Sequence, residues 1–252
     1  MSKKTAIIQF PGSNCERETQ VAARLNQGEA DILRWNVSAE VFHQYDAYIL
    51  AGGFSYQDRV RAGAISAKLP ILQLLQEANT AQKPILGICN GCQILAEAGL
   101  IPDLSNDQKL DVALDKNMAD TQYMGFICDW VFVRIQAPEQ NVWTRCFKAG
   151  TILPIPVNHG EGRFVFSENC SEDSIQSLAH IQYCDPKGNA ISKFPVNPNG
   201  SGLNIAGIGN KAGNVFAIMP HPERASFKKQ VPEWVQSIDE SCPTWAPFFE
   251  AI

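Results

Sequence analysis

The sequence of 252 residues predicts an α/β fold with a mostly parallel central sheet, helices on both faces of that sheet, and additional strands in the second half. Segments typical of strands and of helices alternate in the first half, an order that generates parallel strands joined by helices. The strand segments are apolar along their whole length, which is typical of strands covered on both faces. We find no linker and no internal repeat, and therefore expect residues 1–252 to form one domain.

The first half of the chain supplies the expected parallel strands and their helices. Pro11 and Gly12 end the first apolar run, and Gly28 follows the first helical segment, where glycine often ends a helix. Pro70 interrupts a long helical pattern and predicts a kink or break. The expected elements are, in order, a strand at 5–10, a helix at 16–26, strands at 31–35 and 47–50, a helical stretch at 62–80, a strand at 85–88 and a helix at 91–98.

The second half departs from this alternation. Residues 103–122 are polar and weakly periodic, so we predict an inserted loop that contributes little to the core. The stretch 207–213 is rich in glycine but lacks the spacing of a phosphate-binding loop, and it predicts a hairpin. Further strands are expected near 126–135, 151–157, 163–167, 179–184 and 214–219. Four aromatic residues near the end are expected to pack on the core, namely Trp234, Trp245, Phe248 and Phe249.

Composition argues against several classes of function. The chain carries 21 basic and 26 acidic residues and no cluster of lysine and arginine, which disfavours a nucleic-acid groove or an anionic membrane face. The apolar stretch 6–10 is too short for a signal sequence, and no stretch approaches the roughly 18 apolar residues of a membrane span. We therefore expect a cytoplasmic protein whose eight cysteines remain thiols.

Two cysteines, Cys89 and Cys92, lie between an apolar strand and a helix. This spacing allows a redox pair or half of a zinc site. Nothing else in the sequence is typical of a thioredoxin, however, and neither a second close cysteine pair nor a group of nearby histidines completes a zinc site, so we expect no bound metal. The Gly-x-Cys-x-Gly frame around Cys89 is instead typical of a nucleophile elbow, a tight turn that presents one reactive side chain.

An elbow places the sulfur of Cys89 at the carboxyl end of the sheet, beside the N-terminus of the next helix. Unpaired N–H groups and the helix dipole there favour the thiolate, and the N–H of Asn90 is a natural donor to an oxyanion. Cys92 is expected to be a small core residue. A second oxyanion donor, the N–H of Gly53, is expected in the Gly-Gly turn after another strand, and a plain flexible loop is the alternative.

A cysteine nucleophile requires a base, and two His-x-Glu sequences are available. His221 and Glu223 directly follow an apolar strand, where α/β sheets gather their sites. Pro222 favours an extended backbone at His221, so Glu223 can face the same side and orient the imidazole. We therefore predict His221 as the base. His159 and Glu161 either line a pocket or an interface or form a solvated turn, and the sequence leaves these interpretations open.

These sequences together resemble the triad-type (class I) glutamine amidotransferases and, more narrowly, the glutaminase subunits of phosphoribosylformylglycinamidine synthase. The elbow and the His-Pro-Glu sequence carry the broader resemblance. The narrower one rests on further stretches at 10–15, 52–56, 61–65, 158–164 and 197–201. The resemblance covers most of the chain, up to about Ala225. The family usually has a glycine where this chain has Gln57, which leaves the shape of that loop open.

The resemblance implies a flavodoxin-like fold in which Cys89 attacks the side-chain amide of glutamine, with His221 as base and Glu223 orienting it. Gln93 and the loop at Gly52 would help to hold glutamine. The resemblance implies no cofactor in this chain: ATP and magnesium belong to a synthetase subunit, which uses the ammonia to convert formylglycinamide ribonucleotide to formylglycinamidine ribonucleotide. A small accessory subunit is a further expected partner.

Two alternatives remain. Another hydrolase with a cysteine elbow, such as a peptidase of the same broad fold, would leave the stretches at 158–164 and 197–201 unexplained. A regulatory subunit without activity is disfavoured by the intact cysteine, histidine and glutamate set. We further expect the isolated chain to be a poor glutaminase, with Gly52 and Gly53 acting as a flexible hinge that a partner fixes in the productive position.

Overall fold

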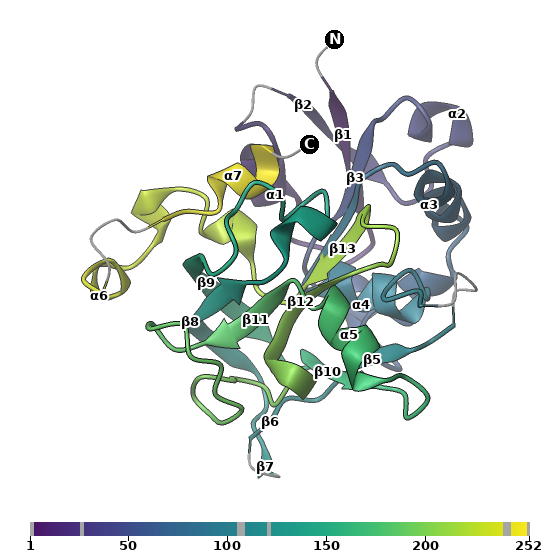
Figure 1. Ribbon diagram of the computed structural model, residues 1–252. Coiled ribbons are helices and arrows are strands. Elements are labelled where there is room, and N and C mark those ends of the chain that lie inside the picture. Colours follow the sequence, from purple (N-terminus) through teal and green to yellow (C-terminus); the bar gives the residue numbers. More distant parts are fainter. Residues whose placement is uncertain (1–2, 26–27, 105–108, 120–121, 239–242, 251–252) are drawn as a thin grey trace.

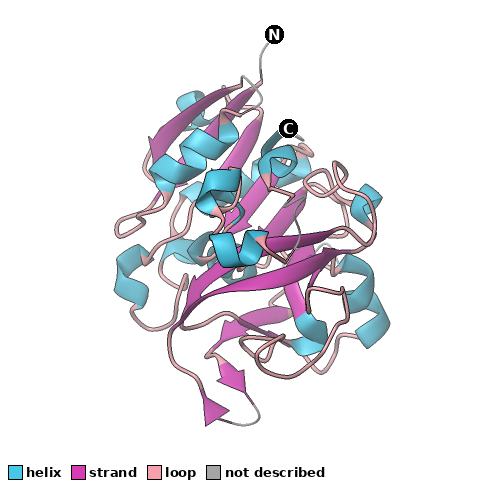
Figure 2. Cartoon of the chain, turned by 90° about the vertical axis from the view of Figure 1, so that its left-hand side faces the viewer, coloured by secondary structure: helices cyan, strands magenta, loops and turns pink. Residues whose placement is uncertain are grey.

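The computed structural model describes residues 3–25, 28–104, 109–119, 122–238 and 243–250. A nine-stranded sheet runs through the molecule, and helices pack against both of its faces (Figures 1 and 2). The strands follow the order β2-β1-β3-β4-β13-β12-β11-β8-β9. The predicted α/β class, with a parallel part and additional strands from the second half of the chain, is confirmed.

Five strands form the parallel part of the sheet. They are β1 (Lys4–Gln9), β2 (Glu29–Arg34), β3 (Ala47–Leu50), β4 (Ile85–Ile88) and β13 (Val215–Ile218). Their carboxyl ends meet at one edge, where open α/β sheets place their sites. In the adjacent strands β4 and β13, Ile88 lies opposite Ile218. The elbow and the His-Pro-Glu turn therefore begin next to each other.

Four strands extend the sheet in antiparallel fashion beyond β13. They are β12 (Ile205–Gly209), β11 (Ile181–Cys184), β8 (Ile127–Ile135) and β9 (Ile152–His159). The predicted hairpin is present, because β12 pairs with β13 across a turn at 210–213. Two small sheets lie outside the main one: β5 (Val112–Asp115) with β10 (Arg163–Phe166), and β6 (Met118–Ala119) with β7 (Gln122–Tyr123).

Helices are present where the sequence predicted them at 16–26 and 91–98, although the first ends at Ala23, and the predicted stretch at 62–80 is α-helical only from Ile71. Pro70 immediately precedes α3, so the predicted break is confirmed. The short helices α2, α5, α6 and α7 were not expected from the sequence. The α-helices are α1 (Glu16–Ala23), α2 (Ala39–Phe42), α3 (Ile71–Thr80), α4 (Asn90–Glu97), α5 (Glu172–Leu178), α6 (Glu233–Gln236) and α7 (Ala246–Glu250). Short 3-10 turns lie at Ser55–Asp58, Ser66–Lys68, Pro138–Gln140, Gly202–Asn204, Pro222–Arg224 and Lys228–Gln230. Within the described ranges, no helix has the length and apolar character needed to cross a membrane.

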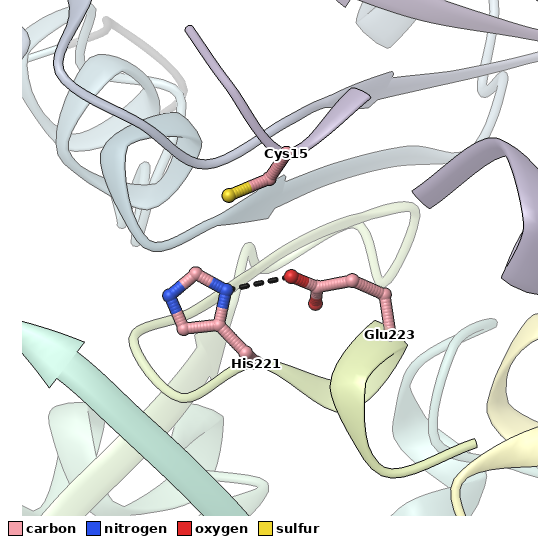
Figure 3. Close-up of side chains that lie close together, drawn as sticks. All are labelled: Cys15, His221 and Glu223. Carbon is pink, nitrogen blue, oxygen red and sulfur yellow. Dashed lines mark hydrogen bonds and ion pairs between the residues drawn. The ribbon is translucent and has the colours of Figure 1, made fainter. Parts of the chain in front are cut away.

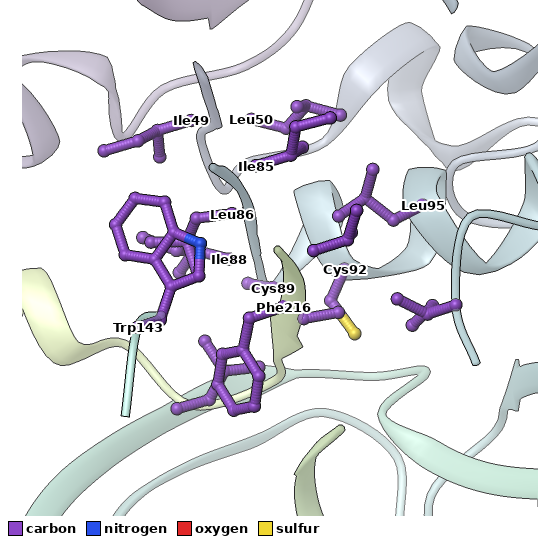
Figure 4. Packing of buried hydrophobic residues seen from close by; sticks show 14 of the residues in the cluster. Ile49, Leu50, Ile85, Leu86, Ile88, Cys89, Cys92, Leu95, Trp143 and Phe216 are labelled. Carbon is purple, nitrogen blue, oxygen red and sulfur yellow. The ribbon is translucent and has the colours of Figure 1, made fainter. Parts of the chain in front are cut away.

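A continuous core surrounds the parallel strands, and Figure 4 shows its part around β4 and α4. The predicted packing of the C-terminal aromatic residues is confirmed for Trp245, Phe248 and Phe249, which are fully buried. It is wrong for Trp234, which is 54% exposed. Trp234 lies on the one-turn helix α6, which is too short to bury a whole face.

The prediction of a peripheral loop at 103–122 is wrong for much of that segment. β5 pairs with β10, and its side chains Val112 and Leu114 belong to the core. Alternating apolar residues at these two positions form one face of a strand, a signal that the polar neighbours obscure over so short a run. Asn117 is also fully buried. The parts of the prediction at 105–108 and 120–121 lie outside the described residues.

Leu114 should therefore be needed for stability. We expect Leu114→Ala to lower the free energy of unfolding by about 2–5 kcal/mol, because it removes buried methyl groups and leaves a cavity. Leu110 provides a matched control in the same segment, since its side chain is 57% exposed. Leu110→Ala should change stability by no more than about 0.5 kcal/mol. Equal midpoints for the two variants in urea denaturation would contradict a core role for β5.

Candidate active site

Cys89 occupies a strained turn between β4 and α4. Its backbone has φ +51° and ψ −106°, a conformation that residues with a side chain rarely adopt and that often marks functional sites. A Cβ atom at Gly91 would collide with the carbonyl oxygen of Leu50, and one at Gly87 would lie 2.5 Å from the carbonyl oxygen of Gly91. Only glycine fits at either position. The tight elbow expected from these two glycines is therefore present.

The sulfur of Cys89 lies at the beginning of α4 and is nearly buried, at 6% exposure of the residue. The N–H of Cys89 donates to the carbonyl oxygen of Ile218 at 2.8 Å, which joins the elbow to β13. The thiol donates to the carbonyl oxygen of Asn158 with an Sγ–O distance of 3.6 Å. The N–H groups of Gly53 and Asn90 donate no hydrogen bond within the part of the chain that the structure describes. Both predicted oxyanion donors are thus unengaged.

Cys92 lies one turn further along α4 and points into the core (Figure 4). It is fully buried, and burial raises the pKa of its thiol well above the usual value. A neutral thiol in this setting packs as a small apolar side chain. The predicted division of roles between the two cysteines of the Cys-x-x-Cys sequence agrees with this burial.

His221 and Glu223 form a buried pair at the exit of β13 (Figure 3). The imidazole Nδ1 lies 2.6 Å from the carboxylate Oε1 of Glu223. Burial alone would lower the pKa of His221, but the charges of Glu223 and Cys89 outweigh it and raise this pKa to about 10. The other ring nitrogen, Nε2, has no hydrogen-bond partner among the described residues. One side of the ring is therefore held by a carboxylate, and the other remains able to exchange a proton.

Gly52 lies between Cys89 and His221. A Cβ atom added to Gly52 would lie 3.0 Å from Cε1 of His221 and 3.3 Å from Cβ of Cys89. The absence of a side chain there lets the thiol and the imidazole approach each other. Gly52 does not line the cavity described below, so the structure gives it a packing role and does not support the predicted contact with substrate.

The Gly-Gly turn is packed more closely than a flexible hinge would be. The carbonyl oxygen of Gly52 accepts from the N–H groups of Asn14 and Cys15, each at 3.3 Å. Gly53 has φ +136° and forms a β-bridge with Ser13, and a Cβ on it would lie 2.6 Å from the nitrogen of Asn14. The expected hinge is therefore corrected. Glycine is required here for close approach of two backbone segments, which fixes the position of the Gly53 N–H.

A cavity of about 150 Å³ opens beside the elbow. Its wall includes the predicted site residues Gly53, Cys89, Gln93, His159 and Glu161. The side-chain amide of Gln93 donates to the carbonyl oxygen of Glu161 at 2.6 Å and accepts from the side chain of Asn90 at 2.9 Å. Gln93 thus forms part of the wall and fixes its neighbours. Aromatic side chains surround the cavity, namely Phe54, Tyr123 and Phe126.

His159 and Glu161 line this cavity, in agreement with the pocket alternative, yet they do not form a second pair like that of His221 and Glu223. Nδ1 of His159 lies 3.1 Å from the side-chain oxygen of Asn117. Burial, together with the charge of His221, lowers the pKa of His159 to about 3 and keeps the ring neutral. The carboxylate of Glu161 instead accepts from the N–H of Ala62 at 3.1 Å. The prediction of His221 over His159 as the base agrees with this arrangement.

Asp58 also lines the cavity and was not among the site residues expected from the sequence. Burial, and then the charge of Glu161, raises the pKa of the Asp58 carboxyl to about 6. Its Oδ1 accepts from the side chain of Asn90 at 3.3 Å. Gln57, beside it, has φ +60°, in the left-handed region that glycine favours. The glycine usual at this position in the family would have indicated the turn that directs Asp58 into the site.

Buried amides support the loop that carries His159. Asn117 donates to the carbonyl oxygen of His159 at 2.7 Å and accepts from the N–H of Gly162 at 3.0 Å. Asn199 donates to the carbonyl oxygen of Gly162 at 2.8 Å, and the hydroxyl of Ser201 donates to the side-chain oxygen of Asn199 at 2.8 Å. The stretch at 197–201, which the sequence singled out, therefore positions the wall of the cavity and does not enter it.

Comparison with known proteins agrees with this geometry. The family model of the CobB/CobQ-like glutamine amidotransferase domain matches residues 2–252. Phosphoribosylformylglycinamidine synthase subunit PurQ of Methanothrix thermoacetophila is 43% identical over 91% of this chain and 89% of its own length. The same subunit of Pyrococcus horikoshii is 37% identical over 92% of this chain and 99% of its own length.

Solved structures lead to the same family. A chain in the structure of PurLQS from Thermotoga maritima has a TM-score of 0.74 and 31% identity, covering 96% of this chain and 98% of its own. A glutamine amidotransferase of the same organism has a TM-score of 0.57 at 15% identity, covering 100% and 96%, and shows the shared fold alone. The fold and the cysteine elbow are those of a glutamine amidotransferase. Within that class, the chain belongs to the PurQ family.

Proposed function

We propose that this chain is the glutaminase subunit of phosphoribosylformylglycinamidine synthase. It hydrolyses glutamine to glutamate and supplies ammonia to an ATP-dependent synthetase subunit, which converts formylglycinamide ribonucleotide to formylglycinamidine ribonucleotide in purine biosynthesis. The observation that carries the proposal is the Cys89 elbow placed beside the buried His221–Glu223 pair, in a chain that matches PurQ proteins along nearly its whole length. We also propose a cytoplasmic location, in which the cysteines would remain thiols.

The first half of the reaction forms a thioester. The sulfur of Cys89 attacks the side-chain amide carbon of glutamine, and His221 takes the thiol proton through Nε2. Glu223 holds Nδ1 and stabilises the positive charge that forms on the ring. The carbonyl oxygen becomes an oxyanion, for which the N–H groups of Gly53 and Asn90 are the proposed donors.

The second half releases both products. His221 returns its proton to the departing nitrogen, so ammonia leaves and the glutamyl group remains on Cys89. Water then attacks the thioester while His221 accepts one of its protons, and collapse of that intermediate yields glutamate and regenerates the thiol. Every proton moves through one nitrogen, which accords with the unpartnered Nε2 of His221.

Two carboxylates in the cavity are suited to the α-ammonium group of glutamine. Asp58 and Glu161 both line the wall, and their mutual repulsion contributes to the raised pKa of Asp58. A cation placed between them would relieve that repulsion and replace the water lost on burial. We propose that this pair fixes the α-amino end of glutamine, so that its amide reaches Cys89.

This assignment predicts a pH-dependent KM. Asp58 is charged above about pH 6 and neutral below it, so its attraction for the ammonium group is lost as the pH falls through about 6. Loss of one charge-assisted contact corresponds to about a tenfold or greater rise in KM. Asp58→Asn should have a high KM at every pH and lose this dependence. Asp173→Asn, the same change at an exposed site, should keep the normal profile. An unchanged profile in Asp58→Asn would exclude the contact.

The partners follow from the same family. The PurLQS structure supports assembly with the synthetase subunit PurL, and we propose a small accessory subunit as a further component. ATP and magnesium are then required by the synthetase and not by this chain. We also propose that partner binding raises glutaminase activity, although the close packing of Gly52 and Gly53 removes the hinge that we expected to provide it.

The deciding experiment measures nucleotide product from the assembled enzyme with either glutamine or ammonium chloride as nitrogen source. With Cys89→Ala in the assembly, glutamine should give no product, whereas ammonium should support the wild-type rate. Turnover of glutamine by the chain alone should be lower than in the presence of partner, ATP and acceptor nucleotide. An assembly that uses glutamine without Cys89, or cannot use ammonium, would contradict the proposed division of labour.

A further inference from the structure

A third side chain, Cys15, lies against the outer side of the His221–Glu223 pair. Figure 3 shows its sulfur near the imidazole, and the thiol donates to the side-chain oxygen of Asn14 at 3.2 Å. One ligand atom from each of the three residues lies within 4.8 Å of the others, and all three residues are buried. Cys15 follows the first strand and the pair follows β13, so the fold assembles a group that no local spacing reveals. From this arrangement we propose that Cys15, His221 and Glu223 form an inhibitory site for a zinc-class metal ion.

The cluster holds a buried polar atom without a partner, as a metal site does before it is filled. Oε2 of Glu223 has no hydrogen-bond partner among the described residues. Glu223 itself is 0% exposed. A buried carboxylate oxygen normally has a donor, so the free oxygen at Glu223 points to a missing cation. Cys15 contributes the thiolate sulfur that zinc prefers.

The charges of the filled site would balance. A divalent ion displaces the thiol proton of Cys15 and the proton shared between Nδ1 of His221 and Glu223, of which one moves to Nε2 of His221 and the other leaves to solvent. The ion then compensates one thiolate and one carboxylate. Arg224, which contacts Sγ of Cys15 at 3.1 Å, also contacts Glu18 at 3.0 Å and can stay paired with it when the sulfur turns to the metal.

The donor set selects the class of ion. One sulfur, one nitrogen and one carboxylate oxygen, with water in the fourth position, suit tetrahedral zinc and its analogues cobalt and cadmium. Magnesium and calcium prefer oxygen ligands throughout and are poorly served here. The magnesium that a synthetase partner needs would therefore not fill this site and would not inhibit the chain through it.

Occupation of the site would stop the chemistry proposed above. A metal on Nδ1 of His221 leaves the ring neutral, with its remaining proton on Nε2. Such a ring can neither accept the thiol proton of Cys89 nor act as a strong acid toward the departing ammonia. This consequence rests on the proposed function, whereas the metal site itself does not.

The test is a titration with cobalt(II), read from the absorption band of a cobalt–thiolate bond. The band, with one equivalent of bound cobalt, should appear in the wild-type chain, in Cys89→Ala and in Cys92→Ala. The variant Cys15→Ala should lose the band and bind cobalt at least about tenfold more weakly. Thermal unfolding without metal checks that every variant is folded. In parallel, zinc should inhibit glutamine hydrolysis by the wild type, and a chelator should restore the activity. The variant Cys15→Ala should need at least about tenfold more zinc for the same degree of inhibition, with each protein compared with its own metal-free rate.

The outcomes separate the two parts of the inference. A band that persists in Cys15→Ala and disappears in Cys89→Ala would place the metal between the nucleophile and the base and overturn the site. The absence of any band in the wild type would also overturn the site. Cobalt binding that depends on Cys15 but leaves glutamine hydrolysis unaffected would keep the site and refute the role of His221 as the base.

Discussion

Replacing Cys89 with alanine should lower the rate of glutamine hydrolysis by on the order of 10⁴-fold or more, because no other group at the elbow can form the thioester. The change removes one sulfur atom from a nearly buried position and should leave the fold intact. Cys92→Ala is the matched control, since it alters the same helix but only a core contact. Its rate should stay within about tenfold of the wild type. Steady-state hydrolysis and thermal unfolding of both variants provide the measurement.

Chemical labelling gives an independent check on the nucleophile. An electrophile that mimics glutamine should attach to Cys89 and be found there by mass spectrometry, with free glutamine protecting the site. Cys92 is fully buried and its thiol has a raised pKa, so it should stay unlabelled. Modification of Cys92 in the native protein, or substantial hydrolysis by Cys89→Ala, would show that the elbow has been assigned to the wrong residue.

His221→Ala should reduce hydrolysis by a similar order, about 10⁴-fold, because the thiol then has no proton acceptor and the departing ammonia no donor. The single-turnover rate of thioester formation should fall with it. His159→Ala should retain thioester chemistry and act mainly on KM, since His159 lines the cavity but is held neutral by burial and bonds to Asn117.

Comparing these two histidine variants discriminates between the His-x-Glu sequences. Both residues are buried, so thermal unfolding must first show that each variant is folded. The hydrolysis rate of Glu223→Gln should lie between those of His221→Ala and His159→Ala, because an amide can still accept from Nδ1 but cannot stabilise a charged ring. If His159→Ala abolishes single-turnover chemistry while His221→Ala keeps it, the assignment of the base must be reversed.

The elbow at Cys89 and the turn that carries His221 were predictable because each depends on local chemistry. Glycines on either side of Cys89 permit only a tight turn, and Pro222 restricts the backbone beside His221. The roles of Asp58 and Cys15 were not predictable in this way. Asp58 enters the cavity because the residues around Gln57 adopt left-handed conformations without glycine, and Cys15 reaches the His221–Glu223 pair only through the pairing of distant strands.

Two errors have a common physical origin. The segment containing Leu114 was taken for a loop because its overall polarity outweighed a short alternating pattern. Gly52 and Gly53 were taken for a hinge because glycine permits motion, yet here it permits close contact. In both cases tertiary neighbours decided the outcome: β10 provides the pairing partner for one segment, and the backbone at Ser13 and Asn14 occupies the space around the other.

The hydrogen bond from the N–H of Cys89 to the carbonyl oxygen of Ile218 places the proposed catalytic pair inside a single cooperative unit. Cys89, the proposed nucleophile, continues β4, and His221, the proposed base, continues β13, so their separation is set by the pairing of two central strands instead of by loops. Central strands open only when most of the domain unfolds. Loss of catalysis on heating should therefore coincide with global melting, and slow amide exchange should extend up to the amide of the reactive cysteine itself.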